Sequence, residues 1–224
     1  MPLSRGGNRT AGATNDKTEE IRDYLVRAAE VCFERHGVTK TTIEDVAATA
    51  NVSRPTIYRY FKNRDGLLLA VLLRALRSFN AEANELIAQQ PTFAGAVVEA
   101  MTLCVHTGVT DPYVRLLLGP ESYGLSSMLV GGSAEFYEVA AAVWVPLLTQ
   151  AVEAGDARPD LEVAATCRWL LDVAFLLVTR VLEGAVPEAN VPKILKEFVL
   201  PGLVPHPGTT TPSTRRSRRP ASRG

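Results

Sequence analysis

The sequence contains little of what secreted proteins, metalloproteins and membrane proteins depend on. Its three cysteines, Cys32, Cys104 and Cys167, lie far apart, and an odd number of isolated cysteines predicts buried free thiols rather than a disulfide framework. The three histidines are equally scattered, so no cysteine and histidine group has the spacing of a metal site. We therefore expect no metal, no cofactor and a reducing compartment.

Motifs for catalysis and for membrane insertion are also missing. The chain has no nucleotide-binding glycine motif and no nucleophile elbow, so nothing predicts an enzyme. Residues 1–15 are polar and glycine-rich, unlike a signal peptide. The most apolar run, Trp169 to Val178, is interrupted by Asp172 and is too short to span a bilayer. We expect a cytoplasmic protein with no membrane partner.

The sequence also lacks Asn-Gly or Asp-Gly turns between alternating runs, and the most informative stretch reads as two short helices between residues 43 and 61. Thr41 followed by Glu44 has the spacing of a capping box. Asn51 tolerates the left-handed conformation that ends a helix. Val52 can then fill the inside of the turn. This pattern predicts a first helix that stops sharply and reverses into a second.

The second helix is predicted from Arg54 to Phe61. Ser53 is a good N-cap, and Pro55 follows in the first turn, where its missing N–H costs nothing. Because Ile57 and Phe61 face inward, the polar side chains between them are left outside. Such a helix-turn-helix places its second helix in the DNA major groove. The side chains expected to contact DNA are Thr41, Thr42, Arg54, Pro55, Thr56, Tyr58, Arg59, Tyr60, Lys62 and Arg64.

Between Arg54 and Arg64 there are four basic residues and no acidic one. A solvated basic helix in an ordinary bundle is the alternative interpretation, but the capped and paired arrangement favours DNA binding. The rest of the chain carries the opposite charge: residues 17–64 have a net charge of +2, residues 65–197 of −8, and residues 198–224 contain five arginines and no acid. An acidic body, repelled by phosphate, would help to orient the basic end on DNA.

The stretch from about residue 20 to residue 70 resembles the N-terminal domain of the TetR family of transcriptional regulators. Asn51 departs from the pattern, since the family usually has glycine there. The residues that carry the resemblance are Ala29, Phe33, Gly37, Thr41, Thr42, Ile43, Val46, Ala47, Ala50, Val52, Ser53, Thr56, Ile57, Tyr58, Tyr60, Phe61, Arg64, Leu67 and Leu68. The resemblance implies an all-α protein with an N-terminal three-helix helix-turn-helix domain and a larger helical ligand-binding and dimerisation domain. It also implies a homodimer on a palindromic double-stranded operator, released by a small-molecule effector.

Composition and periodicity divide the chain into four parts. We expect a disordered N-terminal arm at 1–15, the helix-turn-helix domain at 16–64, a helical effector-binding and dimerisation domain at 65–204, and a disordered basic tail at 205–224. The expected helices span 16–36, 64–89, 92–106, 111–118, 133–154 with a kink or break near Pro146, 160–183 with Asp160 as its cap, and 191–200.

The helix predicted over 160–183 is apolar nearly all round and must therefore be covered on two sides. The core covers one side, and a second copy of the chain is the natural cover for the other; complete burial within one chain is the alternative. The residues predicted at this dimer interface are Trp169, Leu170, Val173, Leu177, Val181, Ile194, Leu195 and Phe198.

An effector pocket is predicted among the central helices of the body, where the candidates are mostly apolar and favour a hydrophobic or amphipathic ligand. Asp172 is a polar exception, for which an ion pair with Arg168 is the favoured explanation. Two other functions stay open: a DNA-binding regulator controlled by a protein partner, and a helical carrier or enzyme whose N-terminal DNA-binding domain is vestigial. The predicted lining residues are Met101, Cys104, His106, Tyr113, Arg115, Leu117, Tyr123, Phe136, Trp144, Asp172 and Phe175.

Overall fold

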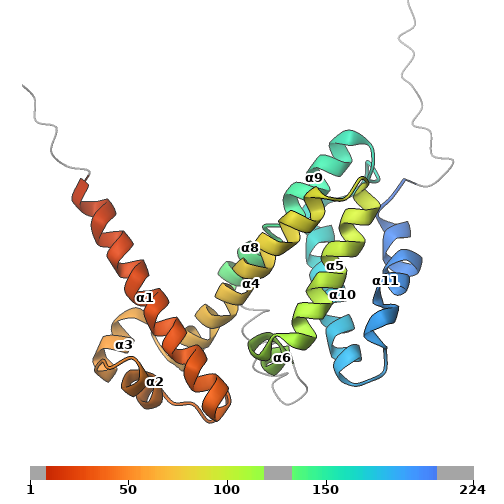
Figure 1. The fold of residues 1–224 in the computed structure, drawn as a ribbon. Helices are drawn as coiled ribbons and strands as arrows, with labels where there is room; N and C mark the ends of the chain where they lie inside the picture. Colours follow the sequence, from red (N-terminus) through yellow and green to blue (C-terminus); the bar gives the residue numbers. More distant parts are fainter. Residues whose placement is uncertain (1–8, 119–132, 206–224) are drawn as a thin grey trace, which may run out of the picture.

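The computed structural model describes residues 9–118 and 133–205, and side chains over 17–115 and 133–205. Every regular element in these ranges is helical, which confirms the all-α prediction. Figure 1 shows a small head at one end, formed by α1, α2 and α3, and a larger helical body, joined by the long helix α4. The elements are α1 (Arg9–His36), α2 (Ile43–Thr49), α3 (Arg54–Tyr60), α4 (Arg64–Ala88), α5 (Phe93–Thr110), α6 (Pro112–Leu118), α8 (Ala134–Ala141), α9 (Trp144–Ala154), α10 (Val163–Leu182) and α11 (Val191–Ile194).

The head has its own core, to which α1, α2, α3 and the start of α4 all contribute. Leu25, Ala29, Ile57 and Leu68 are completely buried in it. This core continues along α4 as far as Leu72, so the packing extends the head past the boundary predicted between residues 64 and 65. The beginning of the linking helix is therefore fixed to the head, and its later turns belong to the body.

The body is built around α5, which packs against α4, α6 and α10. Among the described helices, α5 is the one that is long and apolar enough to cross a membrane by length and composition. A buried core helix has the same composition, and eight of the eighteen residues of α5 are buried. Gly108 allows its close approach to α10, because a Cβ at this position would lie 2.4 Å from Cγ2 of Val178.

Several predicted helix boundaries were wrong. Helix α1 begins at Arg9, so residues 9–15 of the predicted arm are helical, and α5 runs to Thr110 rather than ending at His106. The break predicted near Pro146 is present and lies between α8 and α9, near Ala142. A proline clashes with the carbonyl four residues before it and cannot donate a hydrogen bond to it. For Pro146, that carbonyl belongs to Ala142.

The two C-terminal helices also differ from the prediction. Glu162, not Asp160, caps α10 by accepting from the N–H groups of Ala164 and Ala165. Asp160 instead pairs with Arg158 at 2.6 Å. The helix predicted over 191–200 is one α-turn followed by a π-helical segment at Leu195–Val199 and a 3₁₀ turn. Residues 1–8 and most of the basic tail lie outside the described residues.

Candidate nucleic-acid interface

The first helix of the helix-turn-helix is capped one residue later than predicted. Thr42 is the N-cap of α2, and its hydroxyl and backbone N–H both donate to the Asp45 carboxylate, at 2.7 and 2.8 Å. Both bonds lower the pKa of Asp45, and the bond from the hydroxyl has the larger effect. Thr41 is only 2% exposed and its hydroxyl donates to the carbonyl of Gly37 at 2.8 Å. Thr41 is thus a structural residue, and its predicted DNA contact was wrong.

The turn between α2 and α3 follows the sequence closely. Asn51 has φ of +51°, the left-handed conformation predicted for it, and Val52 packs against the head core. Ser53 caps α3 by accepting from the N–H of Thr56 at 3.3 Å, and its hydroxyl lies 2.8 Å from the Thr56 hydroxyl. Pro55 occupies the first turn. The backbone of α3 is therefore fixed at its start.

Ile57 is buried under α3, and the opposite face of the helix is open to solvent. The side chains of Arg54, Pro55, Tyr58 and Arg59 are exposed there, with Lys62 just beyond. Thr56 and Tyr60 are half-buried. The structure thus brings together most of the predicted DNA-contacting residues on one surface, formed by α3 and the start of α2.

The two arginines of this surface have different partners. Nη1 of Arg54 lies 2.6 Å from Oε1 of Glu44 on α2, and both side chains are about half exposed. Arg59 lies over the ring of Tyr60, 5.0 Å from its centroid, and donates to its hydroxyl at 3.1 Å. Arg54 is therefore held by an opposite charge from the neighbouring helix, whereas Arg59 is held by a neutral group beside it.

Arg64, the first residue of α4, is half-buried. Its Nε donates to the carbonyl of Thr41 at 2.9 Å, and its Nη2 donates to the carbonyl of Val38. These bonds tie the loop between α1 and α2 to the start of α4. Two nitrogens of Arg64 therefore bond within the head, and its predicted DNA contact stays a prediction.

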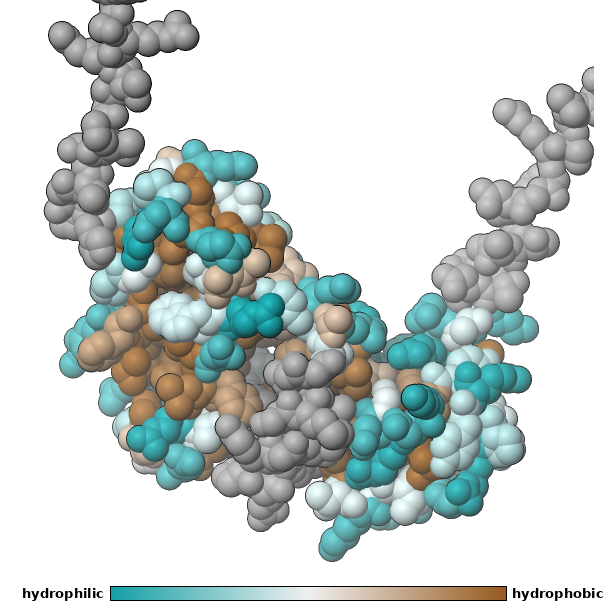
Figure 2. Space-filling model, turned by 180° about the vertical axis from the view of Figure 1, so that it is seen from behind, coloured by the Kyte–Doolittle hydropathy of each residue, from teal (hydrophilic) through white to brown (hydrophobic). Residues whose placement is uncertain are grey.

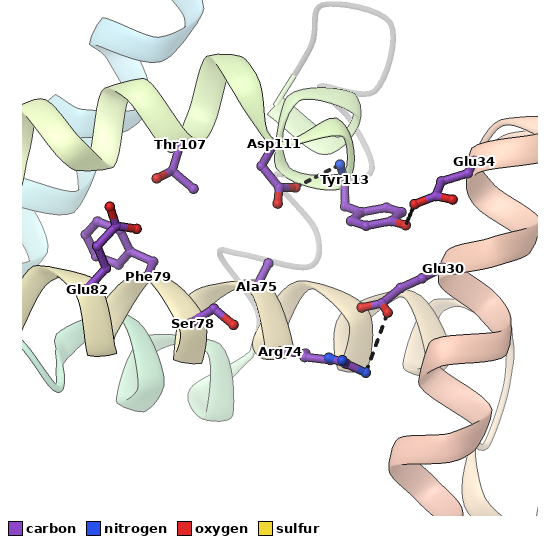
Figure 3. Close-up of a pocket in the computed structure, with 10 residues that line it drawn as sticks. All are labelled: Glu30, Glu34, Arg74, Ala75, Ser78, Phe79, Glu82, Thr107, Asp111 and Tyr113. Carbon is purple, nitrogen blue, oxygen red and sulfur yellow. Dashed lines mark hydrogen bonds and ion pairs between the residues drawn. The ribbon is translucent and has the colours of Figure 1, made fainter.

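A cavity of about 370 Å³ lies where the head meets the body. Figure 3 shows its lining side chains, which come from α1, α4, α5 and the start of α6. Charged and hydroxyl groups are prominent among them: Glu30, Glu34, Arg74, Ser78, Glu82, Thr107, Asp111 and Tyr113, with Ala75 and Phe79. A cavity of this composition is unlike the apolar pocket predicted from the sequence.

Two polar contacts at this cavity connect the head to the body (Figure 3). The Tyr113 hydroxyl of α6 donates to the Glu34 carboxylate of α1 at 2.7 Å. Arg74 of α4 lies 3.5 Å from the Glu30 carboxylate of α1. Burial raises the pKa of Glu30, and Arg74 opposes that rise. Burial and the hydrogen bond to Glu34 together raise the pKa of Tyr113, so its hydroxyl stays protonated and can donate.

Among the described side chains predicted to bind an effector, only Tyr113 lines this cavity. Met101 and Trp144 are buried in the body core, and burial raises the pKa of the Cys104 thiol to about 12. His106, Arg115 and Asp172 are exposed, His106 lying 2.7 Å from Glu188. Phe136 and Phe175 are half-buried. The side chain of Leu117 and the whole of Tyr123 lie outside the described parts of the chain. The structure therefore does not gather the predicted residues into one site.

The predicted pairing of Asp172 with Arg168 was also wrong. Arg168 lies over the ring of Tyr137, 4.6 Å from its centroid, and Asp172 is exposed. The described residues contain no group of three or more histidine, cysteine, aspartate or glutamate side chains placed to hold a metal ion.

The predicted dimer residues fall into two sets. Leu170, Leu177 and Leu195 are buried within the chain, so their assignment to an interface was wrong. Trp169 and Phe198 are 42% and 72% exposed. Val173, Val181 and Ile194 lie at the edge of the core. Leu176, 57% exposed, was missed, although its seven-residue spacing from Trp169 places both on one helical face.

The described elements define a class of protein: an all-helical chain with a helix-turn-helix head on a larger helical body. Residues 25–71 match the model of the bacterial regulatory proteins of the tetR family, so the helix-turn-helix head is of the kind found in TetR-family transcriptional regulators. The matched residues comprise most of α1, all of α2 and α3, and the start of α4.

Relatives extend the similarity into the body. The chain is 25% identical over 208 residues to the transcriptional repressor KstR2 of Rhodococcus jostii, covering 88% of this chain and 96% of the repressor. It is 33% identical over 106 residues to a probable acrEF/envCD operon repressor of Escherichia coli, 47% of this chain and 40% of that protein. A TetR-family regulator from Pectobacterium atrosepticum has the same fold, with a TM-score of 0.66 and 18% identity over 85% of this chain and 97% of that one. These relatives are named as regulators of transcription, not as enzymes.

Proposed function

We propose that the protein is a transcriptional repressor that binds a palindromic operator as a homodimer and releases it when a small molecule binds the body. The observation that carries this proposal is the surface of α3. It is a capped helix, fixed by Ile57 on one side, that presents Arg54, Tyr58 and Arg59 to solvent on the other. Arginines and tyrosines at such a position bond phosphates and base edges. Repressor relatives support the sign of regulation.

The geometry of DNA and the exposed apolar side chains of the body support a dimer. Two heads would enter successive major grooves, whose half-sites lie about 34–36 Å apart. Trp169, Leu176 and Phe198 expose large apolar side chains on the C-terminal helical segments, and a second copy of the chain would cover them. Figure 2 shows brown, apolar areas on the body, at the left of that view, and a mostly hydrophilic head at the right.

Effector control would act at the junction of head and body. A ligand weakens DNA binding only if it binds better to a conformation whose heads are wrongly placed, and only by that difference in affinity. Helix α6 contacts both parts: it packs against α5, and its Val114 belongs to the head core. A ligand that displaces α6 would therefore disturb α1 through Tyr113 and Val114. Because the body interior is mostly apolar, we propose that the effector is hydrophobic and binds at a site other than the polar cavity.

Two other functions make different predictions. A regulator without a small-molecule effector would show no ligand-induced rise in melting temperature. A helical carrier with a vestigial head would function normally after Arg54 and Arg59 are removed. The exposed, ordered α3 surface favours a head in use. Bacterial regulators of transcription act on chromosomal DNA, which supports a cytoplasmic location.

The test is binding of the purified protein to DNA from the region upstream of its own gene, at a stated salt concentration. Wild type should bind one palindromic fragment saturably. Replacing Arg54 and Arg59 by alanine should weaken that binding by at least about a hundredfold, since each base or phosphate contact is lost in both heads. Lys193→Ala with Lys196→Ala removes the same charge from the body and should have little effect. Equal, weak binding of all three proteins to every fragment would contradict the proposal.

A further inference from the structure

The ion pair between Arg54 and Glu44 has a chemical consequence for the sequence that the head can read. We propose that Glu44 is a positioning residue that directs Arg54 to a guanine in the operator and keeps it away from phosphate. This inference rests on the proposed DNA-binding function and specifies the base that it recognises.

The geometry places a carboxylate at the surface that faces DNA. Glu44 lies in the first turn of α2, and Arg54 is the first residue of α3, so their 2.6 Å contact crosses the helix-turn-helix on its outer side. Asp45, the other acidic residue of that turn, is used by the cap of α2. Glu44 takes no part in the cap and pairs with Arg54. Its carboxylate brings one negative charge close to the incoming DNA.

That charge disfavours the contacts that dominate non-specific binding. Non-specific complexes depend on neutralising phosphates with arginine and lysine. The Arg54–Glu44 pair has no net charge, and moving Arg54 to a phosphate would also bring the Glu44 carboxylate toward the anionic backbone. Guanine is different because its N7 and O6 accept two hydrogen bonds and carry no full charge. With one edge of the guanidinium held by Glu44, the other edge remains available for guanine.

Arg59 gives the contrast within the same helix. Its partner is the neutral hydroxyl of Tyr60, so contact with phosphate brings no carboxylate with it. The position of Arg54 also fits its role, since residues at the start of a recognition helix are those that reach base edges. The structure therefore assigns base reading to Arg54 and phosphate binding to Arg59.

The experiment is selection of bound duplexes from a random DNA library, using full-length wild type, Glu44→Gln, Arg54→Ala and the double variant, with Glu85→Gln in the body as a charge control. Wild type should select a palindrome with one guanine per half-site whose preference disappears in Arg54→Ala. In Glu44→Gln the other positions should persist, while the preference for that guanine falls by about tenfold, within the roughly 5- to 150-fold range of a bidentate arginine–guanine contact.

Salt dependence separates positioning from a merely structural role. Glu44→Gln should bind random duplex more tightly than wild type, with a steeper salt slope by about 0.9 for each phosphate newly contacted. The double variant should select the same bases as Arg54→Ala does, and thermal unfolding should show all variants folded. If Glu44→Gln keeps both the base preference and the salt slope of wild type, the inference is wrong. If wild type selects no sequence at all, the proposed function itself is wrong, and the inference with it.

Discussion

The head and the body use their polar groups in different ways. In the head, chain reversals and helix starts are held by side-chain hydrogen bonds: Thr42 with Asp45, Ser53 with Thr56, and Arg64 with the carbonyls of the α1–α2 loop. In the body, α5, α8 and α10 also begin at side-chain caps, from Thr92, Ser133 and Glu162. The core between these helices is large and apolar, and Thr102 and Trp144 bury side-chain polar atoms for which the described residues show no hydrogen-bond partner.

This difference explains where similarity to relatives is found. A hydrogen-bonded cap needs particular residue types at fixed spacing, so a head built of caps leaves a readable pattern in sequence. An apolar core tolerates many combinations of similar volume. Accordingly, the family model matches residues 25–71, which lie in the head and the start of α4.

The largest effect is expected on dimerisation, from substituting exposed apolar residues of the body while leaving its core unchanged. Trp169→Asp with Phe198→Asp places charges where exposed aromatic side chains are proposed to meet a second copy. Buried aromatic anchors at interfaces are each worth about 2 kcal/mol or more, and two-fold symmetry doubles the loss, so the dimer Kd should rise more than about a thousandfold. Sedimentation at micromolar concentration would measure this.

The control is Val145→Asp, which alters an exposed apolar residue on α9. It should leave the dimer unchanged. Circular dichroism should show all variants equally helical. A double variant that sediments as the wild-type dimer would show that the proposed interface lies elsewhere.

The fold of the head could be predicted from sequence almost completely, and that of the body only in outline. Asn51 acts through its own backbone conformation, and the Ser53 hydroxyl accepts from a backbone N–H three residues later, so their roles were visible locally. The errors arose where a tertiary contact decides. Residue type assigned Thr41 to DNA, but its side chain is buried, and residue type did not show that Arg64 bonds the loop carbonyls. No local pattern reports such a partner.

The body shows the same limit for its sites. The sequence of an apolar helix such as α10 predicts that the helix is buried, but it does not predict which face packs against the core. Leu170 and Leu177 were therefore assigned to the interface, and Leu176 was missed. The cavity at the junction joins residues about 30 to 80 positions apart in sequence, such as Glu34 and Tyr113. Its existence depends on how the head docks, which no periodicity encodes.

A smaller, purely structural effect is expected from Gly108→Ala. The added Cβ would lie 2.4 Å from Cγ2 of the buried Val178, and a β-branched side chain cannot easily turn away. Overpacking of this kind costs about 1–3 kcal/mol of unfolding free energy. Urea denaturation should show a lower midpoint for the variant.

Two further variants test this explanation. Adding Val178→Ala should recover much of the loss caused by Gly108→Ala, because it removes the methyl groups involved. Gly95→Ala, on the same helix, meets only the flexible end of Gln90 and the Thr92 hydroxyl, and should be nearly neutral. A Gly108→Ala protein as stable as wild type would mean that α5 and α10 are not tightly packed, and the view of the body as a close-packed core would fail at its centre.

The smallest effect is expected at a contact between the two regions that depends on a single hydroxyl. Tyr113→Phe deletes the hydrogen bond from α6 to Glu34 on α1 and leaves the ring in contact with Phe33, whose centroid is 6.5 Å away. Such a bond contributes about 0.5–1.5 kcal/mol. If the ligand-free protein holds its heads ready for DNA, operator affinity should fall by at most about tenfold, while non-specific binding stays the same.

Tyr137→Phe is the matched control, because it removes a hydroxyl that bonds the Ala164 carbonyl within the body. It should change stability to a similar extent without changing operator affinity. Equal operator binding by wild type and Tyr113→Phe would mean that the hydrogen bond from Tyr113 to Glu34 does not help to set the position of the head. In that case the two regions are coupled through α4 and through the packing of Val114 in the head core. A loss of operator affinity in Tyr113→Phe alone would instead show that α6 also sets the position of the head, through its hydrogen bond to α1. A ligand bound in the body could then change DNA binding by moving α6.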